Sequence, residues 1–588
     1  MGKNRLLAAV AAFSLLGPAL AGCSPEERPG PEQSAAALAE GLSRLDVTGN
    51  EFAGSTVEAV NGMLEYEVSG MNITPSVTVA GIDEVSSNEA VATLKYVWDV
   101  NASPDDFSYE TTVTLERGPG SRWQTRFRST TVHPDLLPGQ RLVRKASPPP
   151  RADILGAGGS VLMRHWPVWR VGLDKSVLGA HEYASSVFYL SLYLGLDADA
   201  LAEKVQAAAP DAFIEAVTVR QDKVSPAFET DIATIPGAAA LPERQVLAPS
   251  PGFAAELLGS VGPATEEMAA DGPLAPGDLA GISGLQREYD SLLRGSDAVT
   301  VRILNADNTA SAPLFEAPSE PGEALETTLD LGIQSRADAV LADSPGASLV
   351  ALQPSTGNLL AAGGGPGTDG TQTALRAEFS LDTGFEPADA LARLRAGGSD
   401  AADDAALGAA AEALGLGVAS GLGTEAFYGA VTEGSDGTQQ AEAAGAGDQV
   451  LASPLAAAVA AATVARGERV SPVLVLNTEA RGGGGGGPSP SASGDGPPAL
   501  SPEEAASLRR TLRANVAGDS AGETFGALQS VSGEPVLAAA GTAGTGGGKP
   551  GHGWVTAIQG DIAVAVFVQG SSADAAALAA SFLDGSSG

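Results

Sequence analysis

Cysteine and histidine are scarce in this chain of 588 residues, and their scarcity excludes several kinds of site. The single cysteine, Cys23, cannot form a disulfide within the chain. The histidines are far apart, and none has a second histidine or a cysteine at the spacing of a helical turn: His133, His165, His181 and His552. The sequence therefore predicts no zinc site or other metal site, and it indicates no cofactor.

Positive charge is also scarce. The chain has 34 lysines and arginines against 71 aspartates and glutamates, which gives a net charge of −37. Such a charge repels phosphodiester backbones, so we expect no nucleic-acid partner. The acidic residues are scattered in short groups, which is typical of a solvated surface rather than of a specific cation site.

Aromatic residues make up only 5% of the chain, whereas hydrophobic residues together make up 44% and glycine occupies 74 positions. This composition predicts globular domains with cores of small aliphatic side chains and few large rings. The chain is too long for one core, so we expect about three domains.

The first residues have the composition of a secretory signal. Lys3 and Arg5 precede an apolar stretch over residues 6–20, which is too short to span a bilayer. The stretch leads into Leu20-Ala21-Gly22-Cys23, which resembles the lipobox of bacterial lipoproteins.

This resemblance implies that residues 1–22 are a lipoprotein signal peptide and that the thiol of Cys23 carries the lipid. Residues 23–34 are charged and rich in proline, so we expect them to form a tether. The predicted location is extracytoplasmic, on the cell membrane, through the lipid anchor. The alternative is an ordinary signal peptide in which Cys23 has no role.

Helical and then alternating patterns follow the tether. They predict a small α+β domain over residues 35–145, with two helices followed by an antiparallel sheet that contains Trp98 and Trp123. The predicted helices cover residues 35–45 and 57–64, and the predicted strands cover residues 76–80, 89–99, 107–117 and 122–131.

The end of this domain resembles part of a known family. A strand that begins at Trp123 runs into His133-Pro134 and then into the exit Ser147-Pro148-Pro149-Pro150. This arrangement is similar to the domain that precedes the dimerisation domain in class B penicillin-binding proteins of the MecA type. The resemblance implies an NTF2-like fold for residues 35–145.

Two segments in the middle of the chain are similar to the dimerisation domain of the same family. They are Leu257-Leu258-Gly259-Ser260-Val261-Gly262 and Gly281-Ile282-Ser283-Gly284-Leu285-Gln286, of which the second continues to Tyr289-Asp290. Arg151 resembles the arginine that opens the domain, although Ala152 stands where glycine is usual. The resemblance implies a dimerisation domain over residues 146–324.

Residues 325–588 resemble the family's transpeptidase domain, a β-lactamase-like α/β sandwich. The segment Thr327-Thr328-Leu329-Asp330-Leu331 is similar to the start of that domain. Hairpins are predicted within residues 347–362 and 554–568. Capping patterns predict helices after Ser453 and Ser501. The glycine- and proline-rich residues 482–498 predict a disordered surface loop. The whole chain is thus predicted to be a multidomain α+β protein.

The resemblance implies three catalytic elements: Ser-x-x-Lys at a helix start, Ser-x-Asn in a loop and Lys-Thr-Gly on a strand. In the first, the lysine lowers the proton affinity of the serine hydroxyl. When the segment is aligned on Phe385, Thr383 takes the serine position and Glu386 takes the lysine position. A carboxylate in place of an ammonium raises the cost of forming an alkoxide beside it.

The second element is missing from its expected interval, and the nearest candidate, Ser399-Asp400, is assigned no role. In the third, Thr542 replaces the lysine and Ala543 replaces the threonine, whereas Gly544 is kept. From residue 325 to the C-terminus the only lysine is Lys549. The family's mechanism needs two lysines in fixed places, so no other alignment restores it.

Three functions follow from this pattern. The first is a non-catalytic penicillin-binding protein homologue that acts as a scaffold or peptidoglycan-ligand-binding partner of cell-wall synthesis proteins. The second is an active penicillin-binding D,D-transpeptidase. The third is an envelope lipoprotein that binds an unrelated ligand on the same fold. The missing lysines favour the first.

Overall fold

The computed structural model describes most of the chain after the predicted tether. The described residues are 30–101, 106–179, 181–270, 274, 276–368, 371–381, 385–397, 404–432, 449–477, 500–518, 522–543 and 551–585. The predicted signal peptide, Cys23 and the predicted loop over residues 482–498 lie outside them. Contacts divide the chain into one unit of residues 1–145 with 299–317 and a second of residues 146–298 with 318–588.

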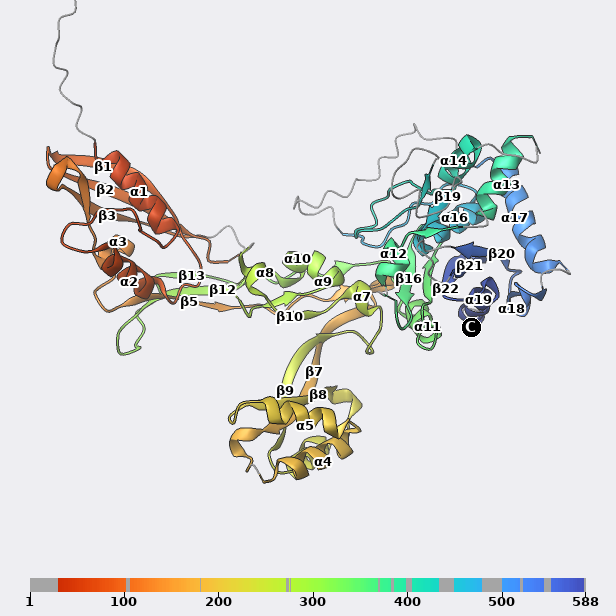
Figure 1. Ribbon diagram of the computed structural model, residues 1–588, viewed down its shortest axis with the longest axis horizontal. Helices are drawn as coiled ribbons and strands as arrows, with labels where there is room; N and C mark the ends of the chain where they lie inside the picture. Colours follow the sequence, from red (N-terminus) through yellow and green to blue (C-terminus); the bar gives the residue numbers. More distant parts are fainter. Residues whose placement is uncertain are drawn as a thin grey trace, which may run out of the picture. The chain divides into compact units, whose positions relative to one another are not determined.

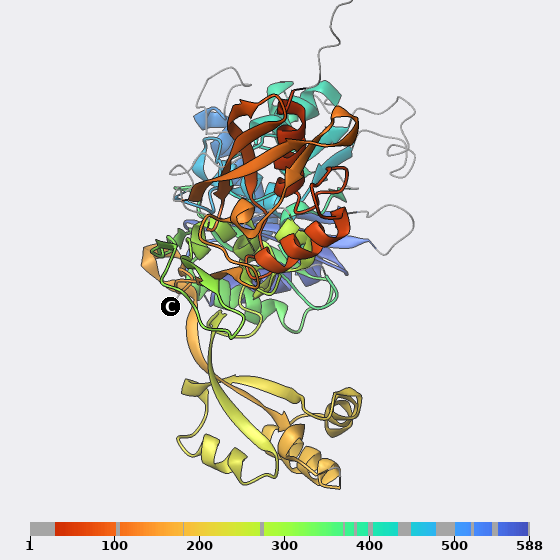
Figure 2. The ribbon, with the colours of Figure 1, turned by 90° about the vertical axis from the view of Figure 1, so that its left-hand side faces the viewer.

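The first unit begins with helices α1 (Glu32–Ser43) and α2 (Val57–Val68), followed by a four-stranded antiparallel sheet, in red and orange in Figures 1 and 2. The strands follow chain order: β1 (Ser76–Ser86), β2 (Glu89–Trp98), β3 (Phe107–Arg117) and β4 (Trp123–Arg126). In β2, buried residues alternate with more exposed ones, as a half-buried strand requires. The helices and the sheet agree with the predicted α+β domain.

One predicted strand is wrong in its second half. The pattern predicted a strand over residues 122–131, but β4 ends at Arg126 and a short helix, α3 (Ser129–Val132), follows. The hydroxyl of Thr131 accepts the backbone N–H of Arg128 at 3.2 Å, and its carbonyl accepts the hydroxyl of Tyr96 at 2.9 Å. A threonine hydroxyl that accepts a hydrogen bond from nearby backbone competes with the hydrogen bonds of a strand. Here the local bond forms, and the chain turns into a short helix.

A three-stranded sheet also belongs largely to this unit, with strand order β13 (Phe315–Ala317), β12 (Ala298–Leu304) and β5 (Arg141–Ser147). Two of its strands therefore come from sequence that follows the dimerisation motifs.

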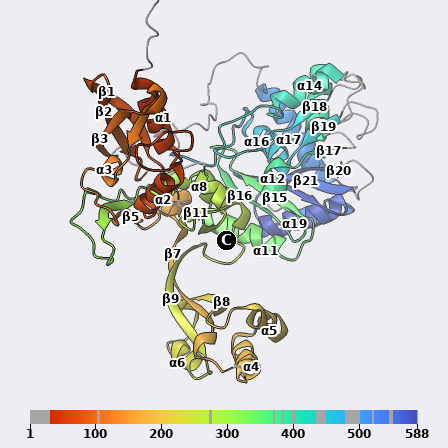
Figure 3. The same cartoon turned by 60° about the vertical axis from the view of Figure 1, so that its left-hand side comes forward.

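The second unit contains a lobe built on three long antiparallel strands, β7 (Val161–Asp174), β8 (Phe213–Arg220) and β9 (Ala238–Leu247). Helices α4 (Tyr183–Leu194), α5 (Ala198–Ala207) and α6 (Phe228–Ala233) pack on them (Figures 1 and 3). The helices and strands share one apolar cluster.

The C-terminal part of the second unit contains a five-stranded antiparallel sheet between two layers of helices. Its order is β16 (Leu359–Gly364), β15 (Ser348–Leu352), β22 (Ile562–Val568), β21 (His552–Gln559) and β20 (Leu537–Ala543). Helices α11 (Leu331–Leu341) and α19 (Ser572–Asp584) share a core with one face of the sheet. Helices α12 (Thr371–Arg376), α13 (Glu386–Arg395) and α16 (Pro454–Arg466) share a core with the other.

Both hairpins predicted from the sequence are in this sheet. Strands β15 and β16 pair with each other, and β21 joins β22 through the two residues Gly560 and Asp561. The α/β sandwich predicted for the C-terminal residues, and with it the multidomain α+β fold, is confirmed.

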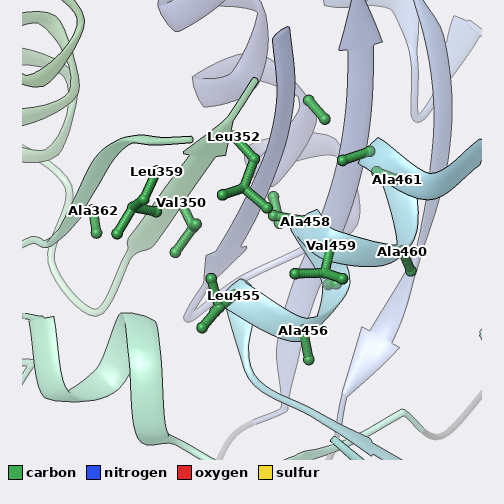
Figure 4. Packing of buried hydrophobic residues seen from close by; sticks show 14 of the residues in the cluster. Val350, Leu352, Leu359, Ala362, Leu455, Ala456, Ala458, Val459, Ala460 and Ala461 are labelled. Atoms are coloured by element: carbon green, nitrogen blue, oxygen red, sulfur yellow. The ribbon is translucent and has the colours of Figure 1, made fainter. Parts of the chain in front are cut away.

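Helix α16 shows how the alanine-rich composition is used. Every residue from Pro454 to Val464 is buried, so the helix has no polar face and lies wholly in the core. Figure 4 shows Leu455 and Ala458 of this helix beside Val350 and Leu352 of β15, and Leu359 and Ala362 of β16 belong to the same apolar cluster. Ser453 caps the helix by accepting the N–H of Ala456, as predicted.

None of the described helices is both long enough and apolar enough to cross a bilayer.

Candidate active site

The segment that the sequence alignment matched to the family's catalytic element leads into helix α13. Pro387 lies in its first turn, acidic residues precede basic ones along it, and both features stabilise a helix with this start. Its N-cap residue, Phe385, is fully buried, and its ring lies 5.5 Å from that of Trp554 on β21. The helix start therefore lies against the sheet, where the resemblance places the catalytic serine element.

Glu386, at the predicted lysine position, is half-buried and hydrogen-bonded to a neighbouring helix. Its Oε2 accepts a hydrogen bond of 2.8 Å from Nδ2 of Asn515, on α17 (Pro502–Ala517). The same nitrogen lies 3.1 Å from the carbonyl oxygen of Ala538 on β20. The side chain of Glu386 is thus engaged in a contact that joins α13, α17 and β20.

Burial raises the pKa of Glu386, the nearby charge of Asp389 raises it further, and the Asn515 hydrogen bond opposes the rise. Asp389, one turn along α13, also has a pKa raised by burial. Two carboxyl groups therefore lie in the first turn, where the family's mechanism requires a cation. The charge of Arg393 lowers the pKa of both carboxyl groups, but Glu386 itself supplies no positive charge in either protonation state.

The strand that would carry the Lys-Thr-Gly element is present. Strand β20 pairs with β21 as far as Thr542, opposite Gly553, and Ala543, opposite His552. Ala543 is buried, and the carbonyl of Thr542 accepts the indole N–H of Trp554 at 3.2 Å. The backbone geometry survives at this position, whereas the lysine ammonium that would bind a carboxylate is replaced by an exposed threonine.

His552 lies at the end of the same pair of strands. Its ring is 4.9 Å from that of Phe379, on the short strand β17 (Phe379–Ser380), and its Nδ1 has no hydrogen-bond partner among the described residues. Burial lowers the pKa of this imidazole. It is therefore neutral at pH 7 and does not replace the missing cations.

Several residues singled out in the sequence lie outside the described residues: Thr383, Gly544, Lys549 and the pair Ser399-Asp400. Of the degenerate motif positions, the structure describes Glu386, Thr542 and Ala543. It brings Glu386 and Ala543 onto neighbouring elements, because Asn515 joins α13 to β20. Asn515 itself was missed in the sequence, since a single asparagine on a helix carries no motif.

The dimerisation motifs meet in a buried network around Arg151. Its guanidinium donates from Nε to Oε1 of Gln286 at 2.6 Å, from one terminal nitrogen to Asp290 at 2.7 Å, and from the other to the Gln286 carbonyl at 2.9 Å. Asp290 also accepts the backbone N–H of Gly281 at 2.7 Å. The side chain of Arg151 is only 3% exposed, so these acceptors compensate a buried charge.

Glycines allow the two motif segments to touch. Gly259 has a φ of 79°, and a Cβ there would lie 1.8 Å from the carbonyl oxygen of Ser283. Gly284 has a φ of 55°, and its Cβ would lie 2.5 Å from the carbonyl oxygen of Leu257. Each glycine thus permits both a left-handed backbone and a close approach that a side chain would prevent.

Two surface depressions lie elsewhere in the second unit. One, of about 600 Å³, lies at the ends of the two sheet hairpins and is lined by Gln353, Asn358, Glu534 and Asp561 among others. The other, of about 590 Å³, lies beside α9 (Gly284–Glu288) and α12 and is lined by Arg287 and Arg376 among others. Neither includes a degenerate motif position. Within the described part of the chain, no three histidine, cysteine or acidic side chains are grouped as metal ligands would be.

Comparison with known proteins agrees with the middle of the chain. The family model of the penicillin-binding protein dimerisation domain matches residues 146–327. A solved complex between penicillin-binding protein PBP2 and MreC from Helicobacter pylori matches with 17% identity and a TM-score of 0.48, covering 75% of this chain and 98% of that one. No curated protein matches the chain. The match identifies a penicillin-binding protein dimerisation domain over residues 146–327, the domain that the motifs around Gly259 and Gly284 predicted.

Proposed function

We propose that this protein is a non-catalytic penicillin-binding protein homologue that serves as a scaffold or ligand-binding component of cell-wall synthesis. The observation that carries the proposal is the state of Glu386. When the segment is aligned on Phe385, Glu386 takes the position of the catalytic lysine. Its carboxyl group is hydrogen-bonded to Asn515, which also contacts β20. That side chain therefore contributes to packing rather than to serine or threonine activation.

The size of the expected loss favours an inactive domain over a slow one. Loss of general-base assistance alone costs about 10²–10⁴ in rate, and loss of a residue from a coupled catalytic group costs about 10⁶. Here the lysine is replaced at both motif positions, by Glu386 and by Thr542. Residual transpeptidation after both losses is too slow to serve cell-wall synthesis.

The catalytic proposal is tested with a peptide that ends in D-Ala-D-Ala. The purified protein is incubated with it beside an active class B transpeptidase, and release of D-alanine is measured. We expect no release above the rate without protein. Release at a rate comparable to that of the active enzyme would contradict the proposal and support the D,D-transpeptidase alternative.

The scaffold role is separated from the binding of an unrelated ligand by partner capture. A tagged chain is cross-linked in cells, and cell-wall synthases are sought among the captured proteins. We expect enrichment over an unrelated envelope lipoprotein carrying the same tag. Equal recovery from both would argue against a role in cell-wall synthesis.

We further propose that the protein is held on the outer face of the cell membrane by a lipid on Cys23. The support is the sequence that ends in Leu20-Ala21-Gly22-Cys23 and the tether-like composition of residues 23–34. A Cys23→Ala variant is expected to leave the membrane fraction. Retention of that variant in the membrane would contradict the proposal.

A further inference from the structure

Helix α4 of the lobe is apolar on two sides. Its inner side packs through Val187 and Leu190 into the core shared with β7 and β8. Its outer side exposes Phe188, Tyr189 and Leu192 to 55%, 55% and 69%. A surface helix ordinarily places polar residues on the side away from the core, so this outer side needs a different explanation.

The exposed side chains form one continuous surface. Phe188 and Leu192 are four residues apart, as are Tyr189 and Tyr193, so each pair lies together on the helix. The rings of Phe188 and Tyr189 are 5.5 Å apart, edge to face. We call Phe188, Tyr189, Leu192 and Tyr193 the α4 face.

One residue of the α4 face, Tyr193, is held in place by a neighbouring helix. The hydroxyl of Tyr193 donates to Asp231 on α6 at 2.9 Å, and its ring lies 5.9 Å from that of Phe228. The ring nevertheless remains 44% exposed. Fixed aromatic rings that remain accessible are typical of the centre of a protein interface, since little side-chain entropy is lost when they bind.

Negative charge surrounds this uncharged surface. Helix α4 itself contains no charged residue. Glu182 precedes it, and Asp197 and Asp199 follow it. Between residues 171 and 235 ten acidic residues stand against four basic ones. A complementary partner therefore combines an apolar surface with a basic border.

We propose that the α4 face binds a helix of a partner protein whose apolar side is bordered by lysines and arginines. The charge distribution disfavours the two other occupants of such a face. A second copy would bring two acidic lobes together, and an anionic lipid surface would repel the same charges. The proposal does not depend on whether the C-terminal domain is catalytic.

The test uses two synthetic amphipathic helices with the same leucine face, one bordered by lysines and one by glutamates. Binding to the purified protein is measured by fluorescence anisotropy at moderate salt. We expect the lysine-bordered peptide to bind at least tenfold more tightly than the other. In a Phe188→Ser/Tyr189→Ser/Leu192→Ser variant, that tight binding should weaken at least tenfold.

A matched control replaces three other exposed apolar residues with serine, at positions outside the α4 face. Val85, Leu137 and Leu476 are 62%, 59% and 53% exposed, and a triple serine variant at these positions should bind like the wild type. Because the α4 variant retains every charge, undiminished binding to it would show attraction to the acidic chain alone and would overturn the proposal. Circular dichroism confirms that both variants fold.

Two further results would also overturn it. Sedimentation could show a dimer that the α4 variant dissociates, which would identify a second copy as the occupant. Vesicles of phosphatidylcholine and phosphatidylglycerol could bind the wild type and release the α4 variant, which would identify a lipid surface. We expect neither a dimer through this face nor vesicle binding by it.

Discussion

Arg151 and Glu386 are both at least partly buried ionisable side chains. The charge of Arg151 is paired with that of Asp290, whereas burial of Glu386 disfavours its charged form. Arg151 donates to Gln286 and Asp290 in a geometry that matches a guanidinium and compensates its burial. Glu386 accepts a side-chain hydrogen bond from Asn515, and burial raises its pKa. The middle domain thus contains a buried network in which the charge of Arg151 is paired, whereas the start of α13 holds a half-buried carboxyl group without an ion pair to a cation of its own turn.

This difference explains why the sequence motifs of the middle domain match the family closely, whereas the predicted active-site motifs match it poorly. A buried ion pair that loses one partner destabilises the fold, so the residues that complete it are constrained together. A catalytic lysine contributes nothing to stability that a well-placed substitute cannot match. A domain can therefore keep its architecture while its chemistry disappears, and the following predictions test that separation.

One of the largest expected effects is on the arginine network. Arg151→Ala removes the donor to Oε1 of Gln286 and one of the donors to Asp290. Asp290 keeps the N–H of Gly281 and the guanidinium of Arg294, so we expect a loss of about 3 kcal/mol in the free energy of unfolding. Urea denaturation followed by circular dichroism measures it. An Arg287→Ala variant, which removes an exposed arginine two residues before Tyr289, is the control and should change stability little. A small loss for Arg151→Ala would show that the network is not structural.

Restoring the family's lysine should harm the domain. In Glu386→Lys the new ammonium cannot accept the hydrogen bond from Asn515, and a half-buried cation replaces a carboxyl group. We expect a loss of about 2–4 kcal/mol. Glu386→Gln keeps an acceptor for Asn515 and should be close to the wild type. If the lysine variant were more stable than the glutamine variant, Glu386 would not be a packing residue.

Asp338 on α11 provides a pH-dependent comparison. It accepts hydrogen bonds from Gln334 and from the backbone N–H of Ala254, and burial raises its pKa to about 6. The native state therefore favours the protonated acid, and this contribution to stability is complete below pH 3.8 and lost as the pH rises through about 6. The loss should amount to about 3 kcal/mol.

Asp338→Asn removes that titration while keeping a neutral polar side chain. Its stability relative to the wild type should rise between pH 4 and pH 8, as measured by urea denaturation at a series of pH values. An Asp330→Asn variant at the exposed cap of the same helix is a control for general charge effects. A constant difference between Asp338→Asn and the wild type over this range would contradict the assignment.

The smallest effect concerns a helix cap. Ser501 accepts the N–H of Glu504, and Glu504 accepts the N–H of Ser501 in return. Ser501→Ala should cost about 1 kcal/mol, because one hydrogen bond of this capping box is lost. Thermal denaturation measures the change, and Ser501→Asp should restore most of it. An unchanged stability in Ser501→Ala would show that the capping box does not contribute to the stability of the domain.

Much of the fold could be predicted because its signals are local. Ser453 and Ser501 mark the starts of α16 and α17, and Gly560-Asp561 marks a tight hairpin. The short helix α3 was missed because the hydrogen bond from Arg128 to Thr131 outweighs the alternating pattern around it. Pairing of β12 with β5 was equally hidden, since it joins segments more than 150 residues apart.

The lysine count in residues 325–588 predicts that the family's chemistry is absent, and this stays a prediction. The contacts around Glu386 could not be predicted from the sequence. The contact from Glu386 through Asn515 to β20 depends on three elements brought together by the sheet, and no spacing in the sequence indicates it. The exposed side of α4 was hidden for a similar reason, because an apolar helix is read as core until its neighbours are known.

Intact-mass analysis after exposure to a penicillin tests the central claim most directly. The purified protein is incubated with the β-lactam beside an active class B penicillin-binding protein, and both are weighed by mass spectrometry. The account predicts that the active protein gains the mass of one acyl group and that this protein's mass is unchanged. An adduct on a hydroxyl of residues 325–588, at Thr383 above all, would contradict the account and reveal a working acyl-enzyme with a different base.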